Sequence, residues 1–317
     1  MAASGAGSAS GSGDDVATAP IGRLTAVVTA RLAAAGVPSP AVDARWLVEA
    51  ATDGAEIAVV DRDRLEALVA RRVAREPLQV ILGTTAFRHV TLQTRSGVFV
   101  PRPETEIVAG VAVEAALAVA SPPARVVDAC TGSGTIALAV AAEVPGVRVV
   151  ATEVDADAVA VARANLARLQ GRTPPHGHPW RPGDRLAPAA SVDVVTGDLL
   201  DGVDASWRGR VDVLVANPPY LPAADRGSWE PEVAGHDPDR SLVGGADGHE
   251  VVVALLTLAG EWLRPGGTVV VEIDDRRGAD ALAAARGAGL VECRLVADLT
   301  GRDRAVIGHR DDGAVTA

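Results

Sequence analysis

Residues 124–140 read ARVVDACTGSGTIALAV: a strand pattern, a glycine loop and a helix pattern in direct succession. The strand segment, 125–129, has no regular polar alternation, which is typical of a parallel sheet covered by helices on both faces. Gly132 and Gly134 permit a tight turn and place no Cβ between the backbone and a ligand. The stretch therefore predicts an α/β fold with a ligand-binding loop at the carboxyl end of its first strand.

The sequence that follows repeats this alternation of strand and helix patterns. The further candidates are strands at 147–152, 192–196, 211–216 and 268–273, with helices at 135–144, 157–169 and 250–263. Two last strand candidates, 291–297 and 304–309, are separated by a short loop and predict an antiparallel edge. We therefore expect a mostly parallel sheet with an antiparallel edge and helices on both faces.

The length of 317 residues suggests about two domains. Residues 20–83 have helical periodicity and carry eight arginines against eight acidic residues, which predicts a small neutral helical domain used for docking. Residues 84–102 alternate and predict a β-hairpin linker, and residues 103–310 form the α/β domain. Residues 1–19 are rich in Gly, Ala and Ser, so we expect a disordered tail there and a second tail at 311–317.

Composition excludes several classes of protein. The net charge of −11 argues against broad electrostatic binding to nucleic acid. Two cysteines, Cys130 and Cys293, are too few for a disulfide framework or a cysteine zinc site, and they favour the reducing cytoplasm. The apolar stretch 107–120 is too short to span a membrane. We expect a cytoplasmic protein with no membrane partner.

Residues 171–190 form a Pro-, Gly- and His-rich stretch longer than a usual connection. We interpret it as a solvated insertion. His176 and His178 could bind a metal ion, but two histidines alone are weak evidence, and we expect no metal site.

Acidic residues lie at or just after the ends of three of the predicted strands. Glu153 ends the second strand, 19 residues after Gly134, where an acid can hold ribose hydroxyls. Asp198 ends the third strand and could accept a hydrogen bond from an adenine amino group while Leu199 packs on the ring, or it could cap a turn. The glycine loop with Glu153 alone would suit a dinucleotide-binding enzyme equally well.

Asp128 separates a dinucleotide cofactor from an adenosine cofactor that carries no phosphate. A pyrophosphate favours the positive end of a helix and is repelled by a nearby carboxylate. S-adenosylmethionine (SAM) has no phosphate and carries an ammonium group that can pair with an acid. Asp128 at the entrance to the loop therefore favours SAM over a dinucleotide.

Residues 217–220, Asn-Pro-Pro-Tyr, come directly after the strand VDVLVA. Asn217 offers an amide oxygen and Pro218 a carbonyl without a competing N–H, and Pro219 further stiffens the loop. Two acceptors at fixed spacing suit a planar NH2 group, and Tyr220, the only tyrosine of the chain, can stack on a planar amide or base. The loop therefore predicts a substrate with a planar NH2 group, such as an amide or a base.

Taken together, these motifs resemble the HemK/PrmC family, the SAM-dependent N5-glutamine methyltransferases of peptide chain release factors. The resemblance covers residues 21–310. It is carried by REPLQVILGTTAFRHV (75–90), VPRPETE (100–106), the glycine loop, TGDL (196–199), NPPY (217–220), DPDRSLVGGADG (237–248) and LTGRDRAVIGHR (299–310).

The resemblance implies a Rossmann-like SAM-dependent methyltransferase domain preceded by a small all-helical domain. The cofactor site would comprise residues of the glycine loop and of the strand ends, namely Asp128, Cys130, Thr131, Gly132, Ser133, Gly134, Glu153, Asp198, Leu199 and Asn217. The chain departs from the family where Cys130 replaces a usual glycine and Glu153 a usual aspartate.

The implied reaction moves a methyl group from SAM to the side-chain amide nitrogen of the glutamine in the GGQ motif of class-1 release factors. Asn217, Pro218 and Tyr220 would be catalytic, and substrate contacts would span Asn217, Pro218, Pro219 and Tyr220. We expect a monomer that does not bind nucleic acid directly. Three alternatives stay open: amino methylation of adenine or another base in nucleic acid, a ribosome-associated protein that binds SAM without catalysis, and a nicotinamide-dependent dehydrogenase.

Overall fold

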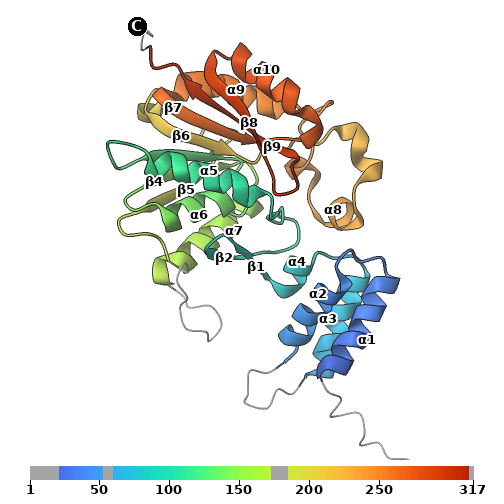
Figure 1. Cartoon of the computed structure of the whole chain (residues 1–317). Coiled ribbons are helices and arrows are strands. Elements are labelled where there is room, and N and C mark those ends of the chain that lie inside the picture. The colour runs from blue at the N-terminus through green and yellow to red at the C-terminus, as the bar shows by residue number, and fades with distance from the viewer. Residues whose placement is uncertain (1–20, 53–59, 173–184, 314–317) are drawn as a thin grey trace, which may run out of the picture. The chain divides into compact units, whose positions relative to one another are not determined.

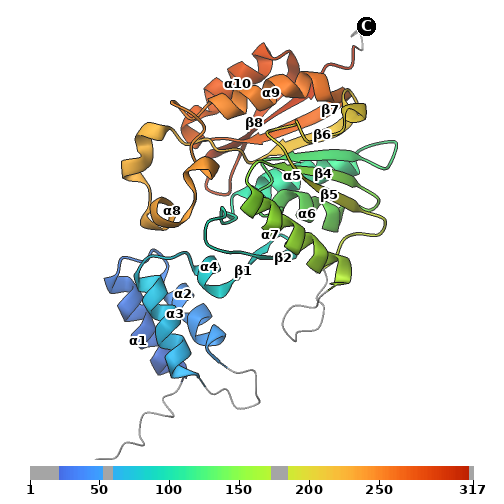
Figure 2. The same ribbon diagram turned by 180° about the vertical axis from the view of Figure 1, so that it is seen from behind.

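The computed structural model describes residues 21–52, 60–172 and 185–313 (Figures 1 and 2). The chain divides into two compact units, Met1–Leu82 and Gly83–Ala317. The expected N-terminal tail and the His176/His178 pair lie outside the described residues. Within the described ranges, no helix is long and apolar enough to cross a membrane.

The N-terminal unit is helical. Its helices are α1 (Ile21–Ala34), α2 (Pro40–Ala50), α3 (Arg62–Val73) and α4 (Leu78–Leu82). Buried Leu32, Leu47 and Val69 form its apolar core. Arg72 Nε donates a 2.7 Å hydrogen bond to Asp43 Oδ2, so each of these two buried charges has a partner of opposite sign.

The C-terminal unit is built on a seven-stranded sheet with the strand order β5-β4-β3-β6-β7-β9-β8. Strands β3 to β7 pair in parallel, whereas β9 is antiparallel to both β7 and β8. The strands are β3 (Arg125–Ala129), β4 (Arg148–Glu153), β5 (Ser191–Thr196), β6 (Val211–Ala216), β7 (Leu263–Glu272), β8 (Leu290–Ala297) and β9 (Asp303–Arg310). The predicted fold class, including the antiparallel edge, is confirmed.

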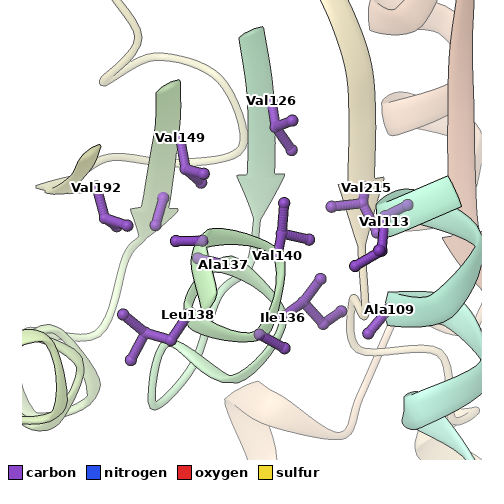
Figure 3. Close-up of a cluster of buried hydrophobic side chains, with 14 of the residues drawn as sticks. Ala109, Val113, Val126, Ile136, Ala137, Leu138, Val140, Val149, Val192 and Val215 are labelled. Carbon is purple, nitrogen blue, oxygen red and sulfur yellow. The ribbon is translucent and has the colours of Figure 1, made fainter. Parts of the chain in front are cut away.

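Helices cover both faces of the sheet because successive strand residues point to opposite sides. Val126 of β3 belongs to a buried cluster that also contains residues of α5 (Thr105–Leu117), α6 (Thr135–Glu143) and α7 (Ala156–Ala167). Figure 3 shows Val126 with residues of α5 and α6 from this cluster. Its neighbour Val127 packs on the other face with α9 (Glu250–Trp262) and α10 (Gly278–Gly287). Figures 1 and 2 show the sheet between these two helical layers. Burial on both faces explains why the strands lack polar alternation.

The alternating segment after residue 83 forms the hairpin of β1 (Thr84–Phe87) and β2 (Val90–Gln93). Phe87 and Leu92 are buried in the same core as α5 to α7. The backbone N–H of Gln93 donates to Asn165 Oδ1 at 2.7 Å. The hairpin therefore packs as part of the C-terminal unit.

Some elements have no counterpart in the sequence prediction. Helix α10 has the Ala-rich sequence GADALAAARG, which contains a single large apolar residue and gives a weak periodic signal. Helix α8 (Pro231–His236) is only six residues long.

Strand β7 begins earlier than the predicted 268–273, at Leu263, which pairs with Val211. Its register then shifts before Thr268, because Pro265 and two glycines interrupt the ladder.

The topology places one edge of the sheet in position to bind a ligand. The chain adds β4 and β5 on one side of β3 and then crosses to add β6 on the other. The loops that leave β3 and β6 therefore diverge at the switch point, where open α/β sheets bind ligands. These two loops are the glycine loop and Asn-Pro-Pro-Tyr.

Candidate active site

A cavity of about 640 Å³ opens at this switch point. Twelve of the thirteen predicted site residues line it: Asp128, Cys130, Thr131, Gly132, Ser133, Glu153, Asp198, Leu199, Asn217, Pro218, Pro219 and Tyr220. Gly134 does not. It caps α6 with a φ of +85°, and a Cβ there would lie 3.1 Å from Leu138 Cδ1 and 3.3 Å from Ala162 Cβ. Gly134 therefore serves the turn and the close packing of α6 on α7.

The glycine loop is held by backbone bonds on both sides. Thr131 N–H donates to the carbonyl of Thr152 at 2.9 Å, and the carbonyl of Ser133 accepts from Asn165 Nδ2 at 3.0 Å. Gly132 has a φ of +58°, and a Cβ built on it would meet no atom within 4 Å. The loop thus presents open backbone to the cavity at Gly132.

Asp128 ties this loop to the first turn of α6. Its Oδ2 accepts hydrogen bonds from Thr131 Oγ1 at 2.5 Å and from Ala137 N–H at 2.9 Å. The side chain is fully buried, and its other oxygen, Oδ1, has no partner. Burial raises the pKa of Asp128 to about 7, against the opposing effect of these two hydrogen bonds. A carboxyl group therefore already takes up a helix N-terminal donor that a pyrophosphate would use.

We expect Asp128→Asn to stabilise the ligand-free protein more at pH 8 than at pH 5. A carboxyl with a raised folded-state pKa stabilises the fold below its unfolded pKa, and that contribution is lost as pH rises through about 7. An asparagine oxygen can keep both bonds that Oδ2 accepts, without the charge. The stability gap between variant and wild type should widen by about 3 kcal/mol. Calorimetric unfolding of both proteins at the two pH values measures it, and a gap independent of pH would contradict the assignment.

Cys130 has a left-handed backbone, with a φ of +57°, at the position where the resemblance leads us to expect glycine. Burial is the largest cause that raises the pKa of its thiol, and the nearby charges of Glu153 and Asp128 add to it. The thiol is thus protonated at neutral pH and is a poor nucleophile. The side chain is tolerated at a backbone cost of about 1–2 kcal/mol.

Substitutions at Cys130 test this backbone assignment. We expect Cys130→Gly to stay within about 1 kcal/mol of wild-type stability, because relief of strain offsets the more flexible unfolded chain. Cys130→Val should be less stable by about 1–2 kcal/mol, since β-branched residues disfavour the left-handed region. Denaturant unfolding of both variants makes the comparison, and equal stabilities would contradict it.

Glu153 reaches back into the glycine loop. Its Oε2 accepts from Gly132 N–H and its Oε1 from Asp155 N–H, both at 2.9 Å. Each oxygen keeps acceptor capacity for a ligand hydroxyl. Asp198 is exposed at the rim of the cavity, and the carbonyl of the adjacent Leu199 accepts from Thr152 Oγ1 at 2.5 Å. Glu153 and Asp198 therefore lie at the carboxyl ends of the neighbouring strands β4 and β5, at a single edge of the sheet.

The Asn-Pro-Pro-Tyr loop contributes the opposite wall. Asn217 Nδ2 donates to Thr105 Oγ1 at 3.1 Å, so the amide oxygen points away from this bond. Within the described part of the chain, nothing donates to Asn217 Oδ1 or to the carbonyl of Pro218. Tyr220 lines the cavity while its hydroxyl donates to buried Glu272 Oε1 at 3.2 Å. The loop offers two acceptors and one fixed aromatic ring.

Residues 237–248, which belong to the family-like stretch DPDRSLVGGADG, brace this loop backbone to backbone. Leu221 N–H donates to Leu242 O at 2.8 Å, and Gly244 N–H donates to Leu221 O at 3.0 Å. A Cβ on Gly244 would lie 2.4 Å from the carbonyl oxygen of Pro219, and one on Gly248 would lie 2.4 Å from that of Tyr220. Only glycine fits at both positions.

The sequence analysis missed several residues that line or close the cavity. Arg102 stacks over Phe99 at 5.1 Å and pairs with the buried carboxylate of Asp237. Arg240 pairs with Asp155 at 3.3 Å. The first contact joins the PRPETE segment to residues 237–248, and the second joins residues 237–248 to the loop after β4. The resemblance marked both segments, but no spacing rule pairs residues 135 positions apart.

The charge of the cavity wall is mainly acidic. Among the described residues that line it, the only basic side chains are Arg102 and Arg240, and each has an aspartate partner. Asp128, Glu153 and Asp198 lie at the ends of three neighbouring strands. In the described ranges, no group of three or more His, Cys, Asp or Glu side chains could hold a metal ion. This wall favours a cationic ligand over a pyrophosphate.

An open α/β sheet with this site at its switch point has the architecture of a methyltransferase. Residues 89–178 match the family described as methyltransferase small domain, and residues 24–83 match the PrmC N-terminal domain. A solved protein-(glutamine-N5) methyltransferase (release factor-specific) from Alicyclobacillus acidocaldarius is 23% identical, covering 67% of this chain and 94% of that chain, with a TM-score of 0.37.

Two curated relatives carry the identification further. The release factor glutamine methyltransferase of Streptomyces coelicolor is 43% identical over 262 residues, which span 80% of this chain and 84% of that protein. The protein of the same name from Deinococcus radiodurans is 38% identical over 300 residues, 92% of this chain and 98% of its own. The chain belongs to the release factor glutamine methyltransferase family.

Proposed function

We propose that this protein transfers a methyl group from SAM to the side-chain amide nitrogen of the glutamine in the GGQ motif of class-1 release factors. The observation that carries the proposal is the pair of open acceptors, Asn217 Oδ1 and the Pro218 carbonyl, beside an acidic cavity. The relatives named above act on a release factor glutamine. Because release factors work in translation, the reaction takes place in the cytoplasm.

The cavity fits SAM as the cofactor. Among the residues that line the cavity, Glu153 and Gly132 would hold the ribose and the adjoining chain, Asp198 and Leu199 would hold the adenine, and Asp128 with Thr131 and Ser133 would hold the amino-acid end. The unpartnered Oδ1 of buried Asp128 is the acceptor that an ammonium group, directly or through water, would satisfy. When bound, SAM would supply an electrophilic methyl group on a sulfonium, so that transfer leaves S-adenosylhomocysteine and releases one amide hydrogen as a proton.

The chain's own contribution is to position a poor nucleophile. An amide nitrogen shares its lone pair with the carbonyl, so its two hydrogens must be engaged before the nitrogen can react. The Asn217 oxygen and the Pro218 carbonyl accept these hydrogens and return electron density to nitrogen. The ring of Tyr220 holds the amide plane. Positioning of this kind can lower a barrier by ~7–11 kcal/mol, more than one general base supplies.

A transfer assay tests the proposal. Purified protein is incubated with methyl-labelled SAM and a class-1 release factor, and with the same factor carrying alanine in place of the GGQ glutamine. We expect label on the first factor and none on the second. Equal labelling of both factors, or label only on added DNA or RNA, would overturn the assignment.

A further inference from the structure

A second cavity, of about 710 Å³, lies at the amino ends of the parallel strands, opposite the candidate active site. Arg148, which lines it, begins β4, and Glu153 of the acidic cavity ends the same strand. The two residues are therefore about 16 Å apart along the strand. The charged side chains that line this second cavity, here called the arginine cavity, are four arginines and one aspartate: Arg125, Arg148, Arg210, Arg264 and Asp212.

Four neighbouring strands bring these arginines together. Arg125 and Arg148 are the first residues of β3 and β4 and pair in register, so their side chains leave the sheet on the same side. Arg210 immediately precedes β6, and Arg264 is the second residue of β7. Because the strand order is β4-β3-β6-β7, the four cations form one row at the amino edge of the sheet.

Asp212 neutralises only one of the four arginines. Its Oδ1 accepts from Arg264 Nε, and its Oδ2 accepts from the backbone N–H of Arg125 at 2.8 Å. In the described ranges of the chain, no ion pair engages Arg125, Arg148 or Arg210. The Arg125 guanidinium lies 5.9 Å from the centroid of the Trp207 ring, a contact that supplies no anion. Three guanidinium groups are therefore open to a ligand.

This concentration of positive charge is unexpected in a chain with 41 acidic and 30 basic residues. Exposed arginines elsewhere, such as Arg31, Arg95 and Arg208, each pair with an acid. Like charges held on adjacent strands repel one another unless an anion balances them. The row of arginines around a cavity therefore indicates a binding site for an anionic ligand.

The donors of the arginine cavity suit a ligand with two phosphate groups. A guanidinium presents paired N–H donors that match two phosphate oxygens, and the hydroxyl of Ser121 adds a further donor to the lining. Three open guanidiniums offer more donors than one carboxylate or one phosphate can engage. The cavity has the volume of a small-molecule site, whereas nucleic acid favours an extended basic surface, which a net charge of −11 disfavours.

We propose that the arginine cavity binds a diphosphate group, as free pyrophosphate or as part of a nucleoside diphosphate, through Arg125, Arg148 and Arg210. This site is separate from the methyl-transfer site and does not rest on the proposed function.

Calorimetric titration of the full-length protein with pyrophosphate, in buffer free of divalent metals, tests the site. We expect one binding site per chain with a Kd in the micromolar range, and a Kd within about twofold of this when SAM is present at saturation. Sulfate at matched ionic strength should bind at least about tenfold more weakly, since it engages fewer donors. No saturable binding, displacement of pyrophosphate by SAM, or equal affinity for sulfate would overturn the proposal.

Arg125→Gln and Arg148→Gln remove single charges from the arginine cavity, and each should weaken pyrophosphate binding by about tenfold or more. Both leave the backbone N–H that Arg125 donates to Asp212 in place. Arg286→Gln is the matched control, because Arg286 is exposed on α10, outside the cavity, and its loss changes the net charge equally. Its Kd should stay within about twofold of wild type. Equal weakening in all three variants would contradict a specific site.

Asp212→Asn changes the affinity in the opposite direction. The variant removes the carboxylate that pairs with Arg264 while asparagine keeps one oxygen acceptor. Pyrophosphate should bind at least about twofold more tightly, because a negative charge at the site is gone and Arg264 is released. Weaker binding with an unchanged Tm would contradict the proposal. If this variant does not fold, the two arginine variants still decide the test.

Titrations with GDP and with a single-stranded RNA oligonucleotide, both at saturating SAM, distinguish the sources of the phosphate groups. A Kd for GDP equal to that for pyrophosphate assigns recognition to the diphosphate alone, a tighter Kd assigns the site to a nucleotide, and a weaker one assigns it to free pyrophosphate. Each of these results supports the diphosphate site. RNA that binds more tightly than pyrophosphate, and loses that affinity in Arg148→Gln, would overturn it in favour of nucleic acid.

Discussion

Asn217→Ala should lower kcat for methyl transfer by about three orders of magnitude, while the Kd for SAM changes by less than about threefold. The variant loses one of two acceptors for the substrate amide and the bond to Thr105 Oγ1 at 3.1 Å. Removal of one preorganised polar group at a reacting centre typically costs 10²–10³ in rate. Single-turnover methylation and calorimetric titration with SAM measure the two quantities separately.

Asn217→Asp is the matched control for this prediction. Aspartate keeps an oxygen acceptor but cannot donate to Thr105, so its kcat should fall between those of wild type and Asn217→Ala. A loss of SAM affinity in Asn217→Ala as large as the loss of rate would assign Asn217 to cofactor binding instead.

Glu153→Ala should have the opposite profile and weaken SAM binding by about a hundredfold. The side chain accepts from the N–H groups of Gly132 and Asp155, both at 2.9 Å, so alanine removes a ligand acceptor and frees the glycine loop. Hydrogen bonds to a charged group are worth about 1.5–3 kcal/mol each, which sets this magnitude. At saturating SAM, kcat should change far less than affinity does.

Glu153→Asp provides the control, because aspartate is the usual family residue here. Its shorter side chain should restore most of the SAM affinity that alanine loses, with less support for the loop. An unchanged SAM titration in Glu153→Ala would contradict the ribose assignment.

Much of the fold could be predicted because the sheet is buried on both faces. Val126 and Val127 point to opposite cores, so the strand is apolar throughout and stands out from the flanking loops. Helix α10 could not be predicted in this way, since alanine packs in a helix without producing a strong periodic pattern. Local composition therefore revealed the layers but not every helix within them.

The candidate site, like the fold, could be predicted from the sequence only in part. The charge of Asp128 led to the prediction of SAM over a dinucleotide. The hydrogen bond that its carboxyl accepts from Ala137 N–H depends on the turn of the loop and could not be predicted. Gly134 was predicted to bind cofactor, whereas it does not line the cavity.

Glu272 lies outside every motif that the sequence analysis used. Its hydrogen bond with Tyr220 joins residues 52 positions apart. Such a pairing arises only when the end of β7 and the loop after β6 come together in three dimensions. A buried acid at the end of an apolar strand is the one local signal that could have drawn attention to it.

Mass spectrometry of release factor peptides tests the central claim most directly. A class-1 release factor is incubated with SAM and either wild-type protein or Asn217→Ala, and the GGQ peptide is fragmented to locate added mass. The account predicts one methyl group on the side chain of the GGQ glutamine with wild-type protein and only a trace with the variant. An unmodified glutamine, or a methyl group on another residue, would contradict it.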